Sequence, residues 1–342
     1  MKLFKQILII LIVFFKTGNL LSENNLFNVN NILLNKKDNL SNNQLANKAI
    51  KEAFDQLLKR ILLEKDIKKI SNLNYFKIRD LVTYYNISKK SDKDNAIFNV
   101  SFNKDKIHDL FYKREILYSD IVDKDFYVLP IFIKKNEIYV FSNNYFYENW
   151  NKLNNDLLEF ILPLENIEVI QSINKSRNNL LGLNLDLILK EYADKNKALV
   201  IIEEDELNKE KIYLKAKIQG KFISKNLNIK KDIEDKNFKN RIIPFLKEEL
   251  TNLVKSENLI DIRTPSFINA KFDLDKKNNL VFFYSKIKKI GLIEEIFILE
   301  FNKNYVNIKI KYLGKLERMV SQLKKDNIIL QLVNNEWLIK IL

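Results

Sequence analysis

The sequence predicts an α+β fold of two or three small domains, each with antiparallel hairpins packed against helices. Residues 41–63 have the apolar spacing of one long amphipathic helix. Short runs in which apolar and polar residues alternate follow it, joined by polar turns typical of hairpins. The 342 residues are 46% hydrophobic and 11% aromatic, so the chain can form packed cores and is too long for one small domain.

The helix over residues 41–63 is the best-defined predicted element. Its apolar residues recur three or four positions apart and therefore share one stripe. The stripe contains Leu45, Ala46, Ala49, Ile50, Ala53, Phe54, Leu57, Leu58, Ile61 and Leu62. Ser41 and Gln44 have the spacing of a capping box, and no Gly or Pro interrupts the run. We expect a sheet or further helices to bury this stripe.

Residues 1–22 have the pattern of a secretory signal peptide. Lys2 and Lys5 precede an apolar run over residues 7–15 that is too short to span a bilayer. We expect cleavage before Glu23; the alternative is an uncleaved anchor in the inner membrane. Because the chain contains no cysteine, we expect export to a bacterial periplasm and not a disulfide-stabilised extracellular module.

An N-terminal α+β domain is predicted over residues 23–162. Its predicted strands cover residues 26–34, 82–88, 96–102, 127–133 and 138–142, and its other predicted helices cover residues 66–70, 75–80, 104–114 and 145–160. Four of these strands pair as two hairpins because polar turns separate them. The helices are expected to cover one face of the sheet.

A middle domain over residues 163–257 and a β-rich C-terminal domain over residues 258–342 complete the predicted chain, with Pro163 at the first boundary. The middle domain has predicted strands at 167–170, 198–203, 212–219 and 222–229 and predicted helices at 183–192 and 233–254. The C-terminal domain has predicted strands at 267–272, 280–284, 294–301, 305–312, 328–333 and 337–341 and a predicted helix at 315–325. Gly220 and the pair Asn334 and Asn335 tolerate the left-handed backbone that tight hairpin turns require.

Three blocks of the N-terminal region resemble the family called domain of unknown function 2066. They are residues 53–61 (AFDQLLKRI), residues 98–103 (FNVSFN) with the helix after them, and residues 127–132 (YVLPIF). The order around the proline differs, and a glycine and a tryptophan of the family's pattern are missing near residues 115–118. The similarity covers about residues 40–230. It implies an exported protein of a Gram-negative bacterium and transfers no functional residue, because the family has no established activity.

The formal charge of +14 is spread along the chain and interleaved with acids, so we expect solvated surface lysines and no nucleic-acid partner. The most basic region is the C-terminal domain, with Lys286, Lys288, Lys289, Lys303, Lys309, Lys311 and Lys315. If these lysines shared one face, they could contact anionic lipid headgroups. The alternative is that they lie on solvated strand faces.

Residue types that carry common enzyme chemistry are scarce. The single histidine, His108, precedes Asp109 and is expected to be a half-exposed helical residue, not part of a Ser-His-Asp site. Five scattered glycines form no phosphate-binding loop, and one histidine without cysteine argues against zinc or non-haem iron. The acids at residues 203–206 could bind Ca²⁺ or form a carboxylate pair, but a charged turn explains them. We therefore assign no catalytic, metal or cofactor-binding residue and expect no cofactor.

An aromatic cluster at the start of the helix predicted over residues 145–160 is the one candidate contact site. It contains Tyr145, Tyr147 and Trp150. Such a cluster could stack on a sugar or a peptide, although core packing is the more common role.

These observations favour a non-enzymatic periplasmic protein that binds or assembles another envelope protein or peptide. Edge strands of small hairpin-rich domains suit the addition of a partner strand. Two alternatives stay open: an envelope hydrolase that uses only carboxylates, and a protein that binds anionic membrane surfaces.

Overall fold

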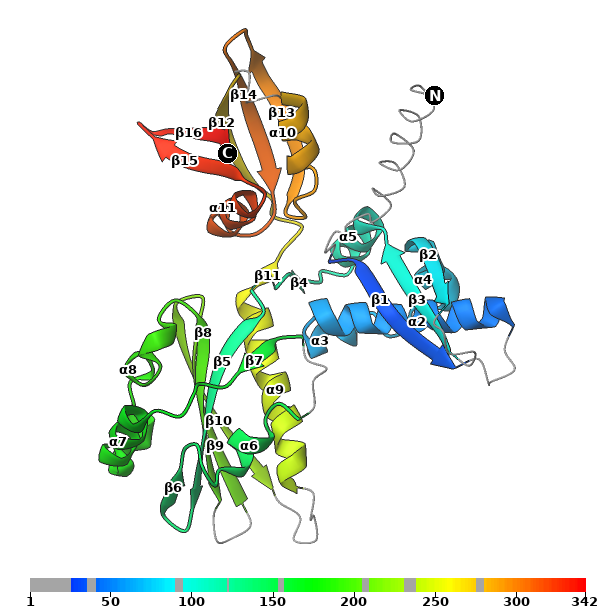
Figure 1. Cartoon of the computed structure of the whole chain (residues 1–342). Coiled ribbons are helices and arrows are strands. Elements are labelled where there is room, and N and C mark those ends of the chain that lie inside the picture. Colours follow the sequence, from blue (N-terminus) through cyan, green and yellow to red (C-terminus); the bar gives the residue numbers. More distant parts are fainter. Residues whose placement is uncertain are drawn as a thin grey trace, which may run out of the picture. The chain divides into compact units, whose positions relative to one another are not determined.

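The computed structural model describes residues 26–35, 41–89, 95–121, 123–152, 157–204, 209–230, 238–274 and 280–342. The protein is an α+β chain (Figure 1). Its described elements divide into two compact units. Unit 1 contains residues 1–118 and 260–342, and unit 2 contains residues 119–259. The chain passes between them at β4 (Tyr118–Ser119) and β11 (Leu259–Ile260).

This division differs from the three consecutive domains that the sequence predicts. A boundary at Pro163 would separate β5 (Asp125–Lys134) from β8 (Asn196–Glu204), which pair in parallel in one sheet. The predicted second boundary, near residue 258, agrees with the point where unit 2 ends. Unit 2 is thus an insertion into unit 1.

The predicted helix at residues 41–63 is α2 (Asn42–Ile61), and Ser41 and Gln44 form the expected capping box. Its stripe packs under an antiparallel sheet of order β1-β3-β2. The bounds are β1 (Asn28–Asn35), β2 (Val82–Lys89), β3 (Asn95–Phe102), α3 (Glu64–Ile67), α4 (Tyr75–Asp80) and α5 (Lys104–Lys113).

The rest of unit 1 is a five-stranded sheet of order β13-β14-β12-β16-β15. Its elements are β12 (Ser266–Asp273), α10 (Leu280–Ile287), β13 (Ile293–Phe301), β14 (Tyr305–Tyr312), α11 (Leu316–Lys325), β15 (Ile328–Val333) and β16 (Glu336–Ile341). The strand predicted at residues 280–284 is wrong, because this segment is the helix α10. Phe283 and Ile287, four residues apart, both reach the core, and Phe283 stacks on Phe272 at 4.7 Å between ring centroids.

Unit 2 is built on a six-stranded mixed sheet of order β10-β9-β8-β5-β6, with β7 pairing beside β5. The remaining strands are β6 (Glu137–Tyr139), β7 (Glu159–Ile161), β9 (Lys209–Ile218) and β10 (Lys221–Lys230). The hairpin predicted around Gly220 is confirmed, with φ of 50° at Gln219 and 81° at Gly220.

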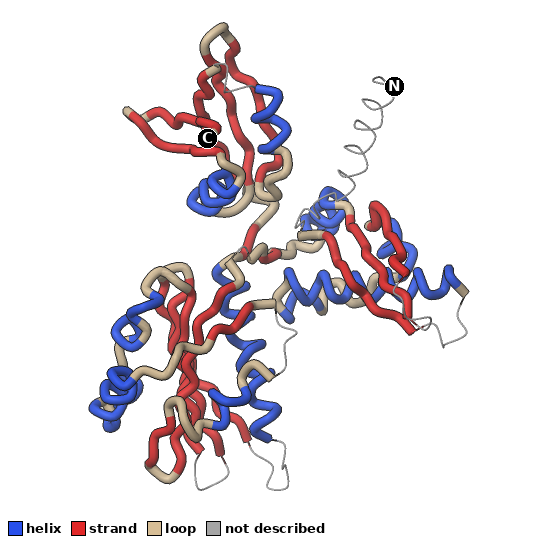
Figure 2. Tube along the Cα trace, in the orientation of Figure 1, coloured by secondary structure: helices blue, strands red, loops and turns tan. Residues whose placement is uncertain are grey.

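Helices cover both faces of this sheet (Figures 1 and 2). One face packs against α6 (Tyr145–Asn149) and α9 (Phe238–Glu257). The other face packs against a layer of short helices: α7 (Ile167–Lys175), η2 (Arg177–Gly182), α8 (Leu185–Ile188) and η3 (Lys190–Tyr192).

Three predictions in unit 2 are wrong in local structure. The helix predicted over residues 145–160 ends at Asn149, and Asn151 instead donates its amide to the carbonyl of Phe160, because Asn competes for backbone groups. The strand predicted at residues 167–170 is the start of α7, which Asn166 caps. The helix predicted at residues 183–192 is divided into α8 and η3.

Some predictions lie outside the described residues, namely the leader over residues 1–22 and the acids Asp205 and Glu206. Among the helices that the structure does describe, none combines the length and apolar character needed to cross a bilayer.

Candidate functional site

The predicted aromatic cluster is divided between core and surface. Trp150 is fully buried and packs edge-on to Phe160, which matches the alternative of a core role. Tyr145 is partly buried, and its hydroxyl bonds to the Asn240 side chain. Tyr147 is also partly buried and donates its hydroxyl to the carbonyl of Pro163 at 2.7 Å. Trp150 is therefore not available to a partner in this structure, and Tyr147 supports a loop.

His108 is buried, with 8% of its surface exposed, so the expectation of a half-exposed histidine is wrong. The rings of Phe27 and Tyr118 lie beside it, at 5.5 and 5.3 Å between centroids. Burial lowers its pKa to about 4, although the nearby Glu294 carboxylate acts in the opposite direction. The imidazole is thus neutral near pH 7, and its Nδ1 lies 3.7 Å from Glu294 Oε1.

The charged groups that the sequence singled out lie in ordinary surroundings. Glu204 Oε2 lies 3.4 Å from Lys134 Nζ and 3.6 Å from Lys239 Nζ at the end of β8. Within the described ranges, no three His, Asp or Glu side chains gather in a way that could hold a metal ion. The seven C-terminal lysines do not form one face, because Lys309 and Lys311 lie on β14 while Lys286 lies on α10.

A hollow on the helical layer of unit 2 is the best candidate binding site. It lies between the loop after β7, helix α7 and the segment from α8 to η3, and its volume is about 260 Å³. Its walls include Pro163, Leu164, Val169, Leu187, Ile188 and Tyr192. Large apolar side chains stand exposed at the hollow or beside it: Leu164 is 83% exposed and Leu187 and Ile167 are each 70% exposed. The site is thus an apolar depression with apolar side chains around it.

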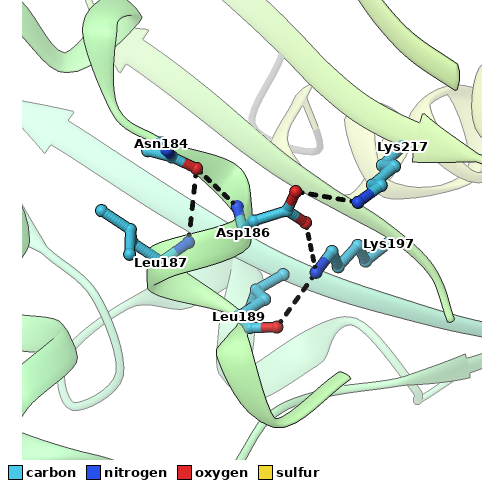
Figure 3. A network of polar contacts seen from close by, with 6 residues as sticks. All are labelled: Asn184, Asp186, Leu187, Leu189, Lys197 and Lys217. Carbon is cyan, nitrogen blue, oxygen red and sulfur yellow. Dashed lines mark hydrogen bonds and ion pairs between the residues drawn. The ribbon is translucent and has the colours of Figure 1, made fainter. Parts of the chain in front are cut away.

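The α8 wall of this hollow is fixed from beneath by a charge network around the buried Lys197 (Figure 3). Lys197 on β8 is fully buried, and its Nζ lies 2.7 Å from Asp186 Oδ1 and donates to the carbonyl of Leu189 at 3.2 Å. Lys217 on β9 donates to the other oxygen of Asp186 at 2.8 Å. Two cations thus hold one carboxylate, and Lys197 and Lys217 lower the pKa of Asp186 by hydrogen bonding to its charged form.

Further hydrogen bonds fix the N-terminal end of the same segment. Asn184 caps α8 by accepting from the amides of Asp186 and Leu187 (Figure 3). Lys215 donates to the carbonyls of Leu181 and Leu183 at 3.2 and 2.7 Å. Short helices are weak by themselves, so these bonds to the sheet supply the rigidity that α8 lacks.

Aromatic side chains support the wall of the hollow at Pro163 and at η3. Tyr147 holds Pro163, as described above, and Tyr192 stacks on Tyr127 of β5 at 4.1 Å between ring centroids. Burial raises the pKa of both Tyr147 and Tyr192, so both hydroxyls stay protonated at neutral pH. An exposed ion pair between Lys190 and Glu168, at 2.8 Å, joins η3 to α7 at the rim.

The chemistry of the hollow suits binding more than reaction. Of the two glutamates that line it, Glu168 has a lowered pKa because Lys190 donates a hydrogen bond to its carboxylate. A general acid needs a raised pKa, which is the opposite shift. Lys197 and Asp186 neutralise each other beneath the wall, and Lys197 has no exposed surface. The depression therefore offers shape and apolar contact.

A second, wider hollow of about 660 Å³ lies between α4 and α5 of unit 1. Lysines that line this hollow pair with aspartates that also line it: Lys106 donates to Asp80, and Lys113 pairs with Asp109. Phe76 beside it is 81% exposed. Six of its eleven lining residues are charged, against three of twelve in the hollow of unit 2, so it offers less apolar contact.

The sequence contained signals for the unit 2 site that were not recognised. Asn166 and Asn184 each precede a short helix as N-caps, a role that Asn favours. Lys197 directly precedes the apolar run of residues 198–202 in β8, where a buried lysine needs an acidic partner. No local pattern identified that partner as Asp186, eleven residues earlier.

Comparison with protein-family models, with curated proteins and with solved structures finds no match. The resemblance to domain of unknown function 2066 therefore stays a prediction. Function has to be argued from the geometry of the chain itself.

Proposed function

We propose that this chain is a non-enzymatic cell-envelope protein that binds another envelope protein, and that the hollow of unit 2 receives a large apolar side chain of that partner. The observation that carries the proposal is the set of exposed side chains Leu164, Ile167 and Leu187 at and beside a hollow whose wall is fixed by Lys197 and Asp186. A contiguous exposed apolar patch with a polar rim is typical of an interaction site.

The size of the hollow supports a protein side chain as its occupant. Small-molecule sites have volumes of about 300–1,000 Å³ and enclose most of their ligand. The hollow is slightly smaller, at about 260 Å³, and its apolar residues continue outward onto the surface. Interfaces between proteins commonly have this form, with one anchor side chain in a pocket and flat contacts around it.

The charges near the hollow favour a basic partner segment. Glu168 and Glu191 line it and Glu165 is adjacent, whereas Lys190 is the cation among its lining residues. Because Lys190 pairs with Glu168, the lining residues have a net charge of −1, that of Glu191, whereas the whole chain has a formal charge of +14. Lysine or arginine residues flanking the apolar anchor would complement it and speed the encounter.

The hydrolase alternative is less well supported. The acidic residues whose pKa values depart clearly from the ordinary values, among the described residues, are Glu168, Asp186 and Asp261, and all three shifts are downward. A glycan hydrolase needs one carboxyl with a raised pKa. A location in the periplasm remains part of the proposal through the leader pattern at residues 1–22, and N-terminal sequencing of the fractionated protein tests it.

Co-purification from the envelope tests the binding role. Leu187→Asp puts a charge at the hollow and should abolish recovery of the partner. Leu181→Asp is the matched control, because Leu181 is also an exposed leucine (55%) of the same helical layer but does not line the hollow. Circular dichroism of both variants establishes that each is folded.

The proposal requires that the protein recovered with the wild-type chain, identified by mass spectrometry, persists with Leu181→Asp and disappears with Leu187→Asp. Equal recovery with both variants would overturn the role of the hollow. Turnover of an envelope glycan by the purified chain, without a stable partner, would overturn the non-enzymatic role.

A further inference from the structure

The second hollow, between α4 and α5 of unit 1, has the size of a small-molecule site. Its volume is about 660 Å³, and such sites have volumes of about 300–1,000 Å³. The outward sides of the two helices line it, because Ile78 of α4 and Ile107 and Phe111 of α5 are buried in the core. It shares no lining residue with the hollow of unit 2.

Hydrogen bonds fix the two helices to each other at both ends of this hollow. Lys106, in the first turn of α5, donates through Nζ to the carbonyl and to the carboxylate of Asp80, at the end of α4. Arg114, directly after α5, donates to the carbonyl of Lys69, in the segment that leads to α4. The two helices therefore run in opposite directions, and a ligand would enter a site that is already ordered.

Part of the lining is apolar. It contains three leucines, Leu73, Leu81 and Leu110, and Phe76. Leu81 is buried, and the other two leucines are partly buried against the core of unit 1. The Phe76 ring stands beside them with most of its surface exposed. A ligand with an apolar body would remove this surface from water, which favours binding.

The lining also has a net charge of +2, because four cations stand against two acids. The cations are Lys77, Lys106, Lys113 and Arg114, and the acids are Asp80 and Asp109. Both acids are already paired, Asp80 with Lys106 and Asp109 with Lys113. Neither of the other two cations has a carboxylate partner in the part of the chain that the structure describes. Lys77 and Arg114 therefore carry the excess charge.

The segments around the hollow have the same sign of charge. Residues 64–81 contain five cations and three acids, and residues 104–115 contain four cations and three acids, so together they have a net charge of +3 with the histidine neutral. No acidic excess in these segments offsets the two cations of the hollow. The occupant that this charge favours is an anion.

The geometry of the two cations suits a carboxylate. A guanidinium group has five N–H donors in a planar fork that matches a carboxylate, and Arg114 uses one of its nitrogens for the Lys69 carbonyl. The Lys77 ammonium adds a second positive charge. Lys77 belongs to α4 and Arg114 follows α5, so each of the two segments that line the hollow supplies one cation.

We propose that this hollow binds a small organic carboxylate with an apolar or aromatic body. The carboxylate accepts hydrogen bonds from Arg114 and Lys77, and the body covers the three leucines beside the Phe76 ring. The proposal is independent of the hollow in unit 2 and of its protein partner.

Titration of the full chain with three probes, followed by NMR of each probe, tests the proposal. Cinnamate has the charge and the aromatic body, cinnamamide has the body without the charge, and acetate has the charge without the body. The variant is Lys77→Gln. The matched control is Lys68→Gln, because Lys68 is also an exposed lysine of unit 1 but does not line the hollow. Circular dichroism establishes that both variants are folded.

Cinnamate should bind at least about tenfold more tightly than cinnamamide or acetate, because it alone engages both the cations and the apolar surface. Lys77→Gln should weaken cinnamate binding about fivefold and leave cinnamamide unchanged, whereas Lys68→Gln should change neither. Equal affinity for cinnamate and cinnamamide, equal losses in both variants, or the absence of saturable cinnamate binding would overturn the proposal. Tighter binding of a tetraglutamate peptide than of cinnamate would also overturn it, by assigning the hollow to an acidic protein segment.

Discussion

The central strands of the two large sheets bury their residues in different ways. In β8 of unit 2, every residue from Asn196 to Ile202 is buried. In β14 of unit 1, buried and half-buried residues alternate without exception from Tyr305 to Tyr312. β8 pairs in parallel with β5 and lies between two helical layers, whereas β14 lies in a sheet with helices packed on its inner side.

This difference determines which elements form the exposed surface over each sheet. A sheet with two covered faces has no exposed face of its own, so a hollow over such a face is formed by the covering helices, as beside α8. A sheet with one covered face leaves the side chains of its other face exposed, as Phe267 and Phe297 are in the five-stranded sheet of unit 1. The burial pattern of one strand thus indicates whether helices or strands form that surface.

The largest expected effects on stability come from alanine substitutions of adjacent residues in β8 and in β14. Ile201 and Ile202 contact opposite cores of unit 2, so Ile201→Ala and Ile202→Ala should each lower the free energy of unfolding by about 2–5 kcal/mol. In β14, Ile308→Ala should cost a similar amount, whereas Lys309→Ala should change stability by less than about 0.5 kcal/mol. Urea denaturation measures all four; a small effect of either β8 variant would mean that one face of that sheet is not packed.

The second prediction concerns how the stability of the chain depends on pH through His108 of unit 1. His108 has a pKa of about 4 in the folded chain and about 6.5 when unfolded. Below pH 6.5 the unfolded state gains a proton that the folded state does not bind, so stability falls as pH decreases toward 4. Between pH 7 and pH 5 the loss should be about 2 kcal/mol.

The variant His108→Gln should abolish most of that loss, because the chain has no other histidine. Urea denaturation at the two pH values measures the difference. An unchanged pH dependence in His108→Gln would mean that the imidazole is accessible to protons in the folded state.

The third prediction concerns the network beneath α8. Asp186→Asn leaves the buried charge of Lys197 without its carboxylate and should destabilise the chain more than Lys197→Met, which removes that charge. Comparing the two urea midpoints tests the order. The reverse order would mean that water or another acid compensates Lys197.

The smallest effect on stability is expected from a substitution in the turn between β9 and β10. Gly220 has φ of 81°, so Gly220→Ala should cost about 1 kcal/mol through backbone strain even though no atom would touch the new methyl group. Gly291→Ala is the control, because its site is also open and its φ is not in the left-handed region. If both variants have equal thermal midpoints, the turn does not require the left-handed conformation.

Elements whose signals lie within a few neighbouring residues could be predicted from the sequence. The capping box of Ser41 and Gln44 and the turn at Gly220 were identified because each depends on a few neighbouring residues. The parallel pairing of β5 with β8 was missed, since more than sixty residues separate the strands. The apolar segment at residues 280–284 was taken for a strand because its aromatic residues favour strands, whereas contact with Phe272 favours a helix.

The candidate site was harder to predict than the fold. Tyr147 was selected for its aromatic ring, yet its structural role is a hydroxyl bond that positions Pro163. Leu164 and Leu187 are ordinary leucines in the sequence, and only the packing of α7 against α8 brings them to one hollow. Exposure of an apolar residue is a tertiary property, which composition and periodicity do not contain.

Photo-crosslinking in cells tests the role of the hollow most directly. A photoreactive amino acid replaces Leu187 in one strain and Leu181 in another, and mass spectrometry identifies the crosslinked peptides. We predict that position 187 captures one envelope protein through a large apolar residue flanked by lysine or arginine, and that position 181 does not. Equal capture at both positions, or capture of an acidic, polar segment at position 187, would contradict the account.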